Sequence, residues 1–349
     1  MPSINGAALI MSPLATQSPR GQSGFSLVEL LVALSINLII VVAAAYLYLG
    51  TSDAKRALYQ QQALNENGQY ALDLIGRDIM NAGFFPAVRS SNPAATSVTV
   101  RIVPDGYSNV VSGIPAAYNS GIFGCAGQTF NAVTRVCEAH SSALIAADTI
   151  VINYFTNDAM GNDIGQRIDC TRGDVNLATE NTARFAISAG VVPKAPLFIS
   201  NRYTLATTTF SIEGQTINTL SLTCSGNRGV TYQPSIAGIE NIQFRYGVYT
   251  DAATLQPSTF YAANDMAALG SISVDGVNKD AWARVVSVEI CLVARALQAT
   301  KTTSATNAVT PYTNCNGASV TPTDKLIRRV YRKVYAVRNN LTQTIIPAS

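Results

Sequence analysis

The sequence contains little charge and few of the side chains on which catalysis depends. Only 13% of its 349 residues are charged, and His140, beside Ser141 in a polar segment, is its single histidine. No glycine-rich phosphate loop or nucleotide-binding fingerprint is present, and no nucleophile, base and metal ligands recur as a converging set. We therefore expect no catalytic residue and no cofactor, and we expect His140 to lie exposed in a loop.

The remaining composition is typical of a β-rich, surface-polar domain outside the cytoplasm. Thr, Ser, Asn, Ala and Gly are abundant, and the net charge of +3 is too small to imply nucleic acid binding by itself. After the N-terminal segments are set aside, about 270 residues remain, which suits one large domain or a domain with long insertions.

A long apolar segment follows a short polar leader near the N-terminus. Residues 30–50 carry no charge, and at about 1.5 Å per residue this helix is long enough to cross a hydrocarbon core of roughly 30 Å. The leader ends in Gly24, Phe25 follows, and Glu29 lies just inside the apolar segment. An ionised side chain in such a place is costly and is usually paired, so Glu29 requires a cation.

Two simpler explanations of this segment are a secretory signal peptide, with residues 43–45 as its small-residue cleavage site, and a plain membrane anchor. The apolar run is longer than the roughly 7–15 residues of a signal peptide core, and it begins at a glutamate. The leader also holds Arg20 as its only cation. The flanking charges, Arg20 on one side and Lys55 and Arg56 on the other, do not settle the orientation.

The arrangement of Gly24, Phe25 and Glu29 closely resembles the processing site of type IV prepilins. The resemblance implies that a prepilin peptidase cuts after Gly24 on the cytoplasmic side of the inner membrane and N-methylates Phe25. It also implies that Glu29 pairs with the N-terminal ammonium of a neighbouring subunit. The implied partners are the peptidase, the major pilin and other minor pilins. The implied location is the inner membrane, crossed once, with a periplasmic domain that later enters the pilus fibre.

The helical pattern continues beyond the membrane segment. Its apolar positions recur at spacings of three, four and seven, and these positions are Leu64, Ala71, Leu72, Ile75, Ile79 and Ala82. This spacing leaves Asp73, Arg77 and Asp78 on the other face of the helix. Gly83 and Pro86 supply a stop signal. The expected organisation is a leader at 1–24, a transmembrane helix half at 25–52, an amphipathic half at 53–82 and a periplasmic β-rich domain at 83–349.

Short strands with alternating polarity follow the helix. They are predicted at residues 97–103, 148–155, 209–212, 217–224, 241–248, 286–295 and 326–339. Glu213 and Gly214 between two of them predict a hairpin. Long loops are expected at 104–147, 250–280 and 299–323. The predicted fold is α+β: a pilin-like long N-terminal helix, part transmembrane and part amphipathic, packed on an antiparallel β-sheet domain with long loops.

The sequence has six cysteines, and none belongs to a CxxC pair: Cys125, Cys137, Cys170, Cys224, Cys291 and Cys315. In an exported domain they predict three disulfides, for which 15 connectivities exist. Zinc ligation is disfavoured because the spacings fit no zinc motif. We expect Cys125–Cys137, which closes a short loop, and then Cys291–Cys315 and Cys170–Cys224. Cys291 falls on the polar face of its strand, where a covering loop with Cys315 can reach it.

Two further segments have alternative interpretations. In the last strand, basic residues are interleaved with the aromatic residues Tyr331 and Tyr335. The basic residues are Arg328, Arg329, Arg332, Lys333 and Arg338. This pattern fits a DNA-binding strip or an edge strand kept soluble by its charges, and we favour the edge strand, so nucleic acid is not the favoured partner. Residues 157–163 gather oxygen ligands but depart from the EF-hand spacing, so a solvated turn is preferred to a calcium site.

The C-terminal half narrows the resemblance. Residues 238–248, 282–295 and 331–339 resemble the PilW group of minor pilins and the related J-type pseudopilins of type II secretion. The implied function is a minor pilin that helps to prime pilus assembly and sits at or near the pilus tip. The alternatives are a J-type pseudopilin that serves protein export and a tip adhesin that binds DNA or a surface.

Overall fold

The computed structural model describes residues 24, 26–84, 87–89, 99–101, 121–132, 134–142, 145, 147–155, 167–172, 174–175, 198–212, 214–226, 231–274, 277–298, 311–324 and 326–341. The chain divides into two compact units, residues 1–54 and 55–349. Helix α1 (Leu27–Asn81) contributes to both units. The amphipathic half of the helix thus belongs to the same unit as the strands.

The first unit contains the apolar part of α1. Residues 27–52 form a helix that is long and apolar enough to cross a membrane by its length and composition. Its large apolar side chains are exposed, unlike those of a helix in a protein core. This segment is consistent with membrane anchoring.

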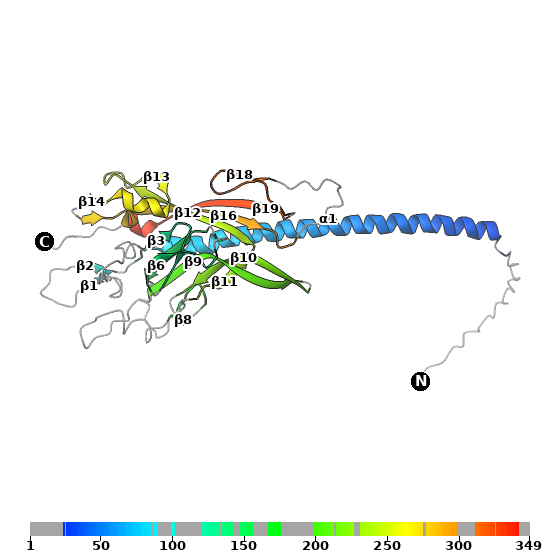
Figure 1. Cartoon of the computed structure of the whole chain (residues 1–349), viewed down its shortest axis with the longest axis horizontal. Helices are drawn as coiled ribbons and strands as arrows, with labels where there is room; N and C mark the ends of the chain where they lie inside the picture. The colour runs from blue at the N-terminus through cyan, green and yellow to red at the C-terminus, as the bar shows by residue number, and fades with distance from the viewer. Residues whose placement is uncertain are drawn as a thin grey trace, which may run out of the picture. The chain divides into compact units, whose positions relative to one another are not determined.

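The second unit contains two antiparallel sheets (Figure 1). The five-stranded sheet has the order β11-β10-β9-β6-β3, with strands β11 (Gln233–Ala237), β10 (Gln215–Ser225), β9 (Phe198–Ile212), β6 (Thr149–Phe155) and β3 (Ile122–Cys125). The four-stranded sheet has the order β13-β12-β16-β19, with strands β13 (Pro257–Tyr261), β12 (Ile239–Tyr249), β16 (Val285–Arg295) and β19 (Arg328–Ala336). The predicted α+β class is confirmed.

Segments expected to be long loops contain regular structure. The first holds β4 (Thr129–Phe130) and β5 (Cys137–Glu138), the second η2 (Ala263–Leu269), β14 (Ile272–Val274) and β15 (Val277–Lys279), and the third β17 (Tyr312–Thr313) and β18 (Ser319–Val320). The remaining elements are β1 (Ala87–Arg89), β2 (Thr99–Arg101), β7 (Arg167–Ile168), β8 (Asp174–Val175), η3 (Trp282–Arg284) and α4 (Arg338–Leu341). The prediction of loops was wrong for these parts, and also for β3 and β13, which lie in the first and second of these segments. The two- and three-residue strands are too short to show a period, and β3 and β13 do not alternate buried with exposed residues.

The second half of α1 packs on the core formed by both sheets. All six residues of the predicted apolar stripe are buried there, together with Ile150, Tyr203, Phe244 and Ile290 of the strands. The predicted stripe is therefore confirmed. The assignment of Asp78 to the exposed face was wrong, since only 9% of that residue is exposed, whereas Arg77 beside it is exposed.

Two glycines of α1 allow β19 to lie directly on the helix. A Cβ atom at Gly68 would meet the ring of Tyr331 at 2.3 Å, and one at Gly76 would meet the ring of Tyr335 at 2.2 Å. The register fits because eight residues of helix and four residues of strand both span roughly 12–13 Å. The Tyr331 hydroxyl donates to the carbonyl of Leu64 at 3.2 Å.

Strand β9 begins earlier than predicted. It starts at Phe198 and runs through Asn201 and Arg202, both of which are buried. Because β9 lies in the middle of its sheet and buries polar side chains, its sequence lacks the apolar alternation from which strands are predicted. The predicted hairpin at Glu213 and Gly214 is confirmed, and Gly214 has a φ of 76°.

The C-terminal strand is shorter than predicted. β19 ends at Ala336 and α4 follows, which places Asn339 at the end of α1. The Asn339 amide donates to the carbonyls of Asn81 at 3.2 Å and Ala82 at 3.0 Å. These carbonyls have no partner within the helix itself, so Asn339 caps α1 from a distant part of the chain. Gly83 follows with a φ of 71°, and Pro86 lies outside the described residues.

The glycine contacts predict a specific destabilisation. We expect Gly68→Val to lower the free energy of unfolding by about 1–3 kcal/mol, since the added side chain overlaps the Tyr331 ring. Gln69→Val, at the exposed neighbouring position, is the control. Denaturant unfolding of the full-length protein in detergent, followed by Trp282 fluorescence, measures both. Equal stability of the two variants would contradict this contact.

Candidate functional site

The segment with the predicted processing site lies at the start of α1. Gly24 is exposed, and a Cβ atom placed on it would have no heavy atom within 4 Å. Phe25 lies outside the described residues. The helix begins at Leu27, and the amide of Leu30 donates to the carbonyl of Ser26 at 3.1 Å. Gly24 is thus accessible, and a larger residue there would meet no steric obstacle from the described part of the chain.

Glu29 lies in the first turn of α1. The spacing from Ser26 to Glu29 is that of a capping box, in which both residues satisfy free amides at the helix start. The partial positive charge of the helix start also favours a carboxylate there. Glu29 is exposed, and no cation among the described residues forms an ion pair with it. Its carboxylate is thus without an ion pair among the residues that the structure describes.

The six cysteines form three disulfides: Cys125–Cys137, Cys170–Cys224 and Cys291–Cys315. The pairs are those expected from the sequence, and their Cα atoms lie 5.7, 6.2 and 5.7 Å apart, which suits a disulfide. The first ties β5 to β3, the second ties the segment after β7 to β10, and the third ties the β17–β18 hairpin to β16.

The third disulfide covers the outer face of the four-stranded sheet. Cys291 and Val293 lie on the face opposite the main core, and they form a small cluster with Cys315, Tyr312 and Val330. Both β16 residues are buried, although the sequence predicts an exposed polar face there. The pinned β17–β18 hairpin thus turns a half-buried strand into one that is covered on both faces.

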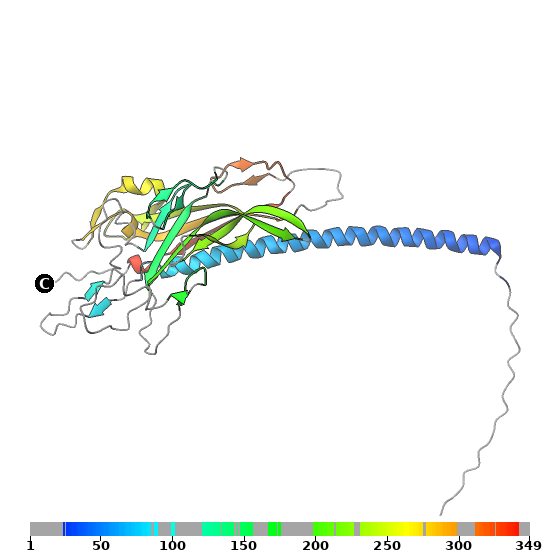
Figure 2. The ribbon, with the colours of Figure 1, turned by 60° about the horizontal axis from the view of Figure 1, so that its bottom comes forward.

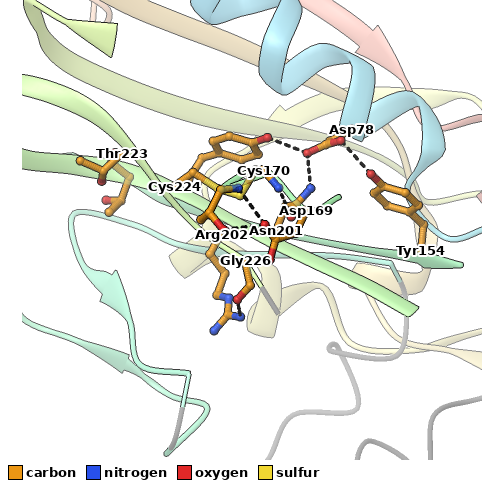
Figure 3. Close-up of a disulfide and its surroundings, with 12 residues drawn as sticks. Asp78, Tyr154, Asp169, Cys170, Asn201, Arg202, Thr223, Cys224 and Gly226 are labelled. Atoms are coloured by element: carbon orange, nitrogen blue, oxygen red, sulfur yellow. Dashed lines mark hydrogen bonds between the residues drawn. A yellow bond between two sulfur atoms is a disulfide. The ribbon is translucent and has the colours of Figure 1, made fainter. Parts of the chain in front are cut away.

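A buried carboxylate joins α1 to the five-stranded sheet. Figure 3 shows Asp78 pointing from the helix toward Tyr154 and Asn201. Tyr154 donates to Oδ1 at 2.9 Å, while Asn201 and Tyr203 donate to Oδ2 at 2.7 and 2.6 Å. Asn201 in turn accepts the amide of Cys170 at 3.0 Å. This network links the helix, two strands and the Cys170–Cys224 disulfide.

Burial raises the pKa of Asp78 above its ordinary value, although the donors Tyr203, Asn201 and Tyr154 oppose the rise. The nearby charge of Asp169 raises it further. Asp169 is also buried, and it accepts the amide and the hydroxyl of Thr171 at 2.9 and 2.6 Å. A pocket of about 420 Å³ lies beside these two carboxylates, lined also by Tyr70, Arg172 and Gln233.

Two further charged residues, Asp148 and Arg284, hold distant segments of the chain together. Asp148 accepts the amides of Gly127 at 2.8 Å and Phe244 at 2.9 Å, so it bridges the β3–β4 turn and β12. Arg284 is almost fully buried, and its guanidinium donates to the carbonyls of Tyr249 at 3.1 Å and Gly270 at 2.6 Å. No sequence pattern marks these residues, because each is satisfied by main-chain groups from distant segments.

The basic C-terminal strand is an edge strand, as predicted. Arg328 forms ion pairs with Glu240 and Asp324. The contact with Arg328 lowers the pKa of Asp324 to about 2. The Lys333 amine lies 2.9 Å from the carboxylate of Asp73. Arg332 lies 3.4 Å from Glu289. Carboxylates of this chain thus pair with three of the five basic residues of this segment, Arg328, Arg332 and Lys333.

The remaining candidates are His140 and the oxygen-rich segment at 157–163. His140 is half-buried rather than exposed, and its Nε2 lies 2.7 Å from the carbonyl of Ala147. In the part of the chain that the structure describes, no three His, Cys, Asp or Glu side chains group as a metal would require. The calcium candidate at 157–163 lies outside the described residues.

Comparisons with known proteins agree with the N-terminal and C-terminal resemblances. Residues 19–45 match the prokaryotic N-terminal methylation motif. Residues 202–339 match the PilW family, described as Type IV Pilus-assembly protein W. No curated protein matches significantly. A type IV-like pilin from Thermus thermophilus matches over 79% of this chain and 97% of its own, with 9% identity and a TM-score of 0.32.

The exposed position of Gly24 yields a prediction about maturation. We expect the mature chain to begin at methylated Phe25 and Gly24→Val to keep its leader. Because Gly24 is exposed and an added Cβ atom meets no heavy atom within 4 Å, a retained leader would reflect failed cleavage by the peptidase and not misfolding. Gly21→Val, at another glycine of the leader, should still be processed. Mass spectrometry of the purified N-terminus distinguishes the forms. An N-terminus near Tyr46 would instead indicate a cleaved signal peptide.

The raised pKa of Asp78 yields a prediction about pH. The folded state binds a proton at Asp78 more tightly than the unfolded state does, so this group favours folding more as the pH falls toward about 4. The stability of the wild type relative to Asp78→Asn should therefore rise between pH 7 and pH 4.

Asp73→Asn is the matched control, because the hydrogen bond from Lys333 lowers the pKa of Asp73. Its contribution is present at neutral pH and is lost on acidification, so the slope should have the opposite sign. Unfolding curves in detergent at several pH values measure both differences. Parallel slopes would contradict the assignment.

Proposed function

We propose that this chain, a PilW-type minor pilin, joins other minor pilins in a small complex that primes pilus assembly and stays at or near the pilus tip. The family is one of pilus-assembly proteins, which are structural proteins and not enzymes. The proposal concerns the place of the subunit in the fibre and its partners.

The bulk of the second unit is the observation that carries the proposal. Two large sheets already cover the second half of α1, and hairpins held by Cys125–Cys137 and Cys291–Cys315 add material outside them. A repeating subunit must leave room for neighbours above, below and beside it at every position. A subunit with this added bulk is best placed where no further subunit follows, which is the tip.

The three disulfides support a periplasmic position for the second unit. Disulfides form and persist in oxidising compartments such as the periplasm, and they are rare in the cytosol. With one helix suited to crossing the inner membrane, the leader and Gly24 then face the cytoplasm, where prepilin peptidase acts on the family's precursors.

Glu29 supports entry of the subunit into a helical bundle. It is the only charged residue between Gly24 and Ser52, and an unpaired carboxylate in hydrocarbon is costly. The methylated amine of a neighbouring subunit supplies the missing cation. This pairing gives the subunit a fixed register in the fibre.

Deletion of the gene tests the role. We expect surface pili to be lost or sharply reduced while the major pilin accumulates in the inner membrane, and we expect a plasmid copy to restore piliation. Immunoblots of sheared and membrane fractions measure both pools. Wild-type piliation in the deletion strain, or immunogold label spread evenly along the fibre at the density of the major pilin, refutes the role.

Two variants at Glu29 separate its roles in that strain. Glu29→Gln keeps the capping-box pattern and removes the charge, whereas Glu29→Ala removes both. If the charge pairs with a neighbour, both variants should be processed and stable but scarce in fibres. If Glu29→Gln enters fibres normally, the residue acts only at the helix start.

A further inference from the structure

The β9–β10 hairpin extends beyond its neighbours in the five-stranded sheet. Strand β6 pairs with β9 only as far as Tyr203, and β11 pairs with β10 only at residues 221–224. Beyond these points, residues 204–212 of β9 and 215–220 of β10 form strand pairs only with each other among the residues that the structure describes. We call this part the ribbon, and it forms the green hairpin end in Figure 2.

The outer edges of the ribbon offer unpaired main-chain groups. Strands joined by a two-residue turn exchange hydrogen bonds at the flanking pair, here Ile212 and Gln215, and then at every second pair. The main-chain groups of Thr207, Thr209 and Ser211 therefore point away from β10. No main-chain hydrogen bond from the described residues reaches them there.

The opposite edge follows the same alternation. The carbonyl of Leu220 points away from β9 and accepts the amide of Gly238 at 3.0 Å, where β11 joins β12. Thr216 and Asn218 lie in the same register and complete the β10 edge. This edge is shorter, because the chain beyond Leu220 is already paired with β11.

The ribbon lacks the features that normally protect a free edge. Residues 204–212 and 215–220 contain no Lys, Arg, Asp, Glu or Pro. Natural edge strands avoid pairing with other chains through such residues. Strand β19, one edge of the other sheet, carries Arg329, Arg332 and Lys333. The contrast indicates that the ribbon edge is left open to a strand.

The two faces of the ribbon specify the chemistry of that strand. Phe210, Ile212 and Ile217 are half-buried on one face, and Ile212 lines a shallow groove of about 120 Å³ against Leu64 of α1. Thr207 and Thr209 are exposed on the other face. A strand that extends both faces alternates apolar residues with Ser, Thr or Asn, and it needs no charge.

We propose that the β9 edge of the ribbon, residues 205–212, binds an uncharged β-strand of another minor pilin by strand addition. This edge is long enough for a typical strand of about 5–6 residues, and main-chain hydrogen bonds supply the affinity. The identity of the partner rests on the proposed function, because a priming complex is built from single copies of different minor pilins.

Photo-crosslinking in piliated cells tests the edge. The full-length chain carries a photoreactive phenylalanine analogue at Thr207 on the β9 edge or, as the matched control, at Thr216 on the β10 edge. We expect the Thr207 position to yield an adduct with a second protein that mass spectrometry identifies by its prepilin methylation motif. An adduct of two copies of this chain, an adduct with a protein lacking that motif, or an adduct from Thr216 alone overturns the proposal.

Variants at Thr209 test the main-chain contact. Thr209→Pro removes the outward amide, Thr209→Val keeps it, and Thr216→Pro removes an amide of the other edge. We expect only Thr209→Pro to lower the yield of the adduct, by at least about tenfold. Equal adducts from Thr209→Pro and Thr209→Val overturn strand addition.

A folding control keeps the result interpretable. Each variant should retain three disulfides and wild-type protease resistance, and if Thr209→Pro does not, Thr209→Lys replaces it, because a charge also blocks an edge. If deletion of the gene abolishes piliation but Thr207 yields no adduct, strand addition is refuted while the proposed function is still supported. Normal piliation after deletion of the gene refutes the proposed function itself.

Discussion

The packing of the second half of α1 on both sheets is the contact on which the rest of the second unit depends. The stripe from Leu64 to Ala82 is buried against residues of both sheets in one hydrophobic cluster. The close approach of β19 to the helix requires glycine at the two positions where its tyrosine rings lie on α1, Gly68 and Gly76. Because the core contains helix and strand residues together, removing α1 would expose apolar residues of both sheets.

Polar groups fix the orientation of this packing more sharply than the apolar stripe does. An apolar stripe tolerates small rotations of a helix, whereas Asp78 must meet Tyr154, Asn201 and Tyr203 at hydrogen-bond distance. A buried carboxylate left without donors would be costly, so alternative packings that separate these groups are disfavoured. Asn339, which caps the end of α1, adds a second fixed point.

The parts of the fold that were predicted from the sequence are those with a clear period. The stripe of α1 and strands β12 and β16 repeat at helical or strand spacing, so their positions could be derived before the structure was known. The position of Asp78 could not, because a carboxylate between Arg77 and Ile79 follows the polar pattern of an exposed face. Its partners Tyr154 and Asn201 lie far away in the sequence, and only the fold brings them to the helix.

The same distinction between local and distant contacts explains why the processing motif could be predicted and why the first half of β9 was missed. The motif of Gly24, Phe25 and Glu29 is local, so a sequence pattern carries it, and its match to the methylation motif is equally local. Strand β9 buries Asn201 and Arg202 among its polar residues, and its first half therefore resembles a loop. The ribbon could not be recognised until both neighbouring strands were seen to stop short of it.

The two sheets differ in how they treat their free edges, and this difference bears on assembly. The β19 edge carries cations, three of which bind carboxylates of this chain, Asp73, Glu240 and Glu289. The ribbon edge carries no charge at all. A subunit with two open edges would add strands without limit, which leads to aggregation. Of these two edges, the charged β19 edge disfavours strand addition and the uncharged β9 edge of the ribbon allows it, so their charges direct an added strand to the ribbon.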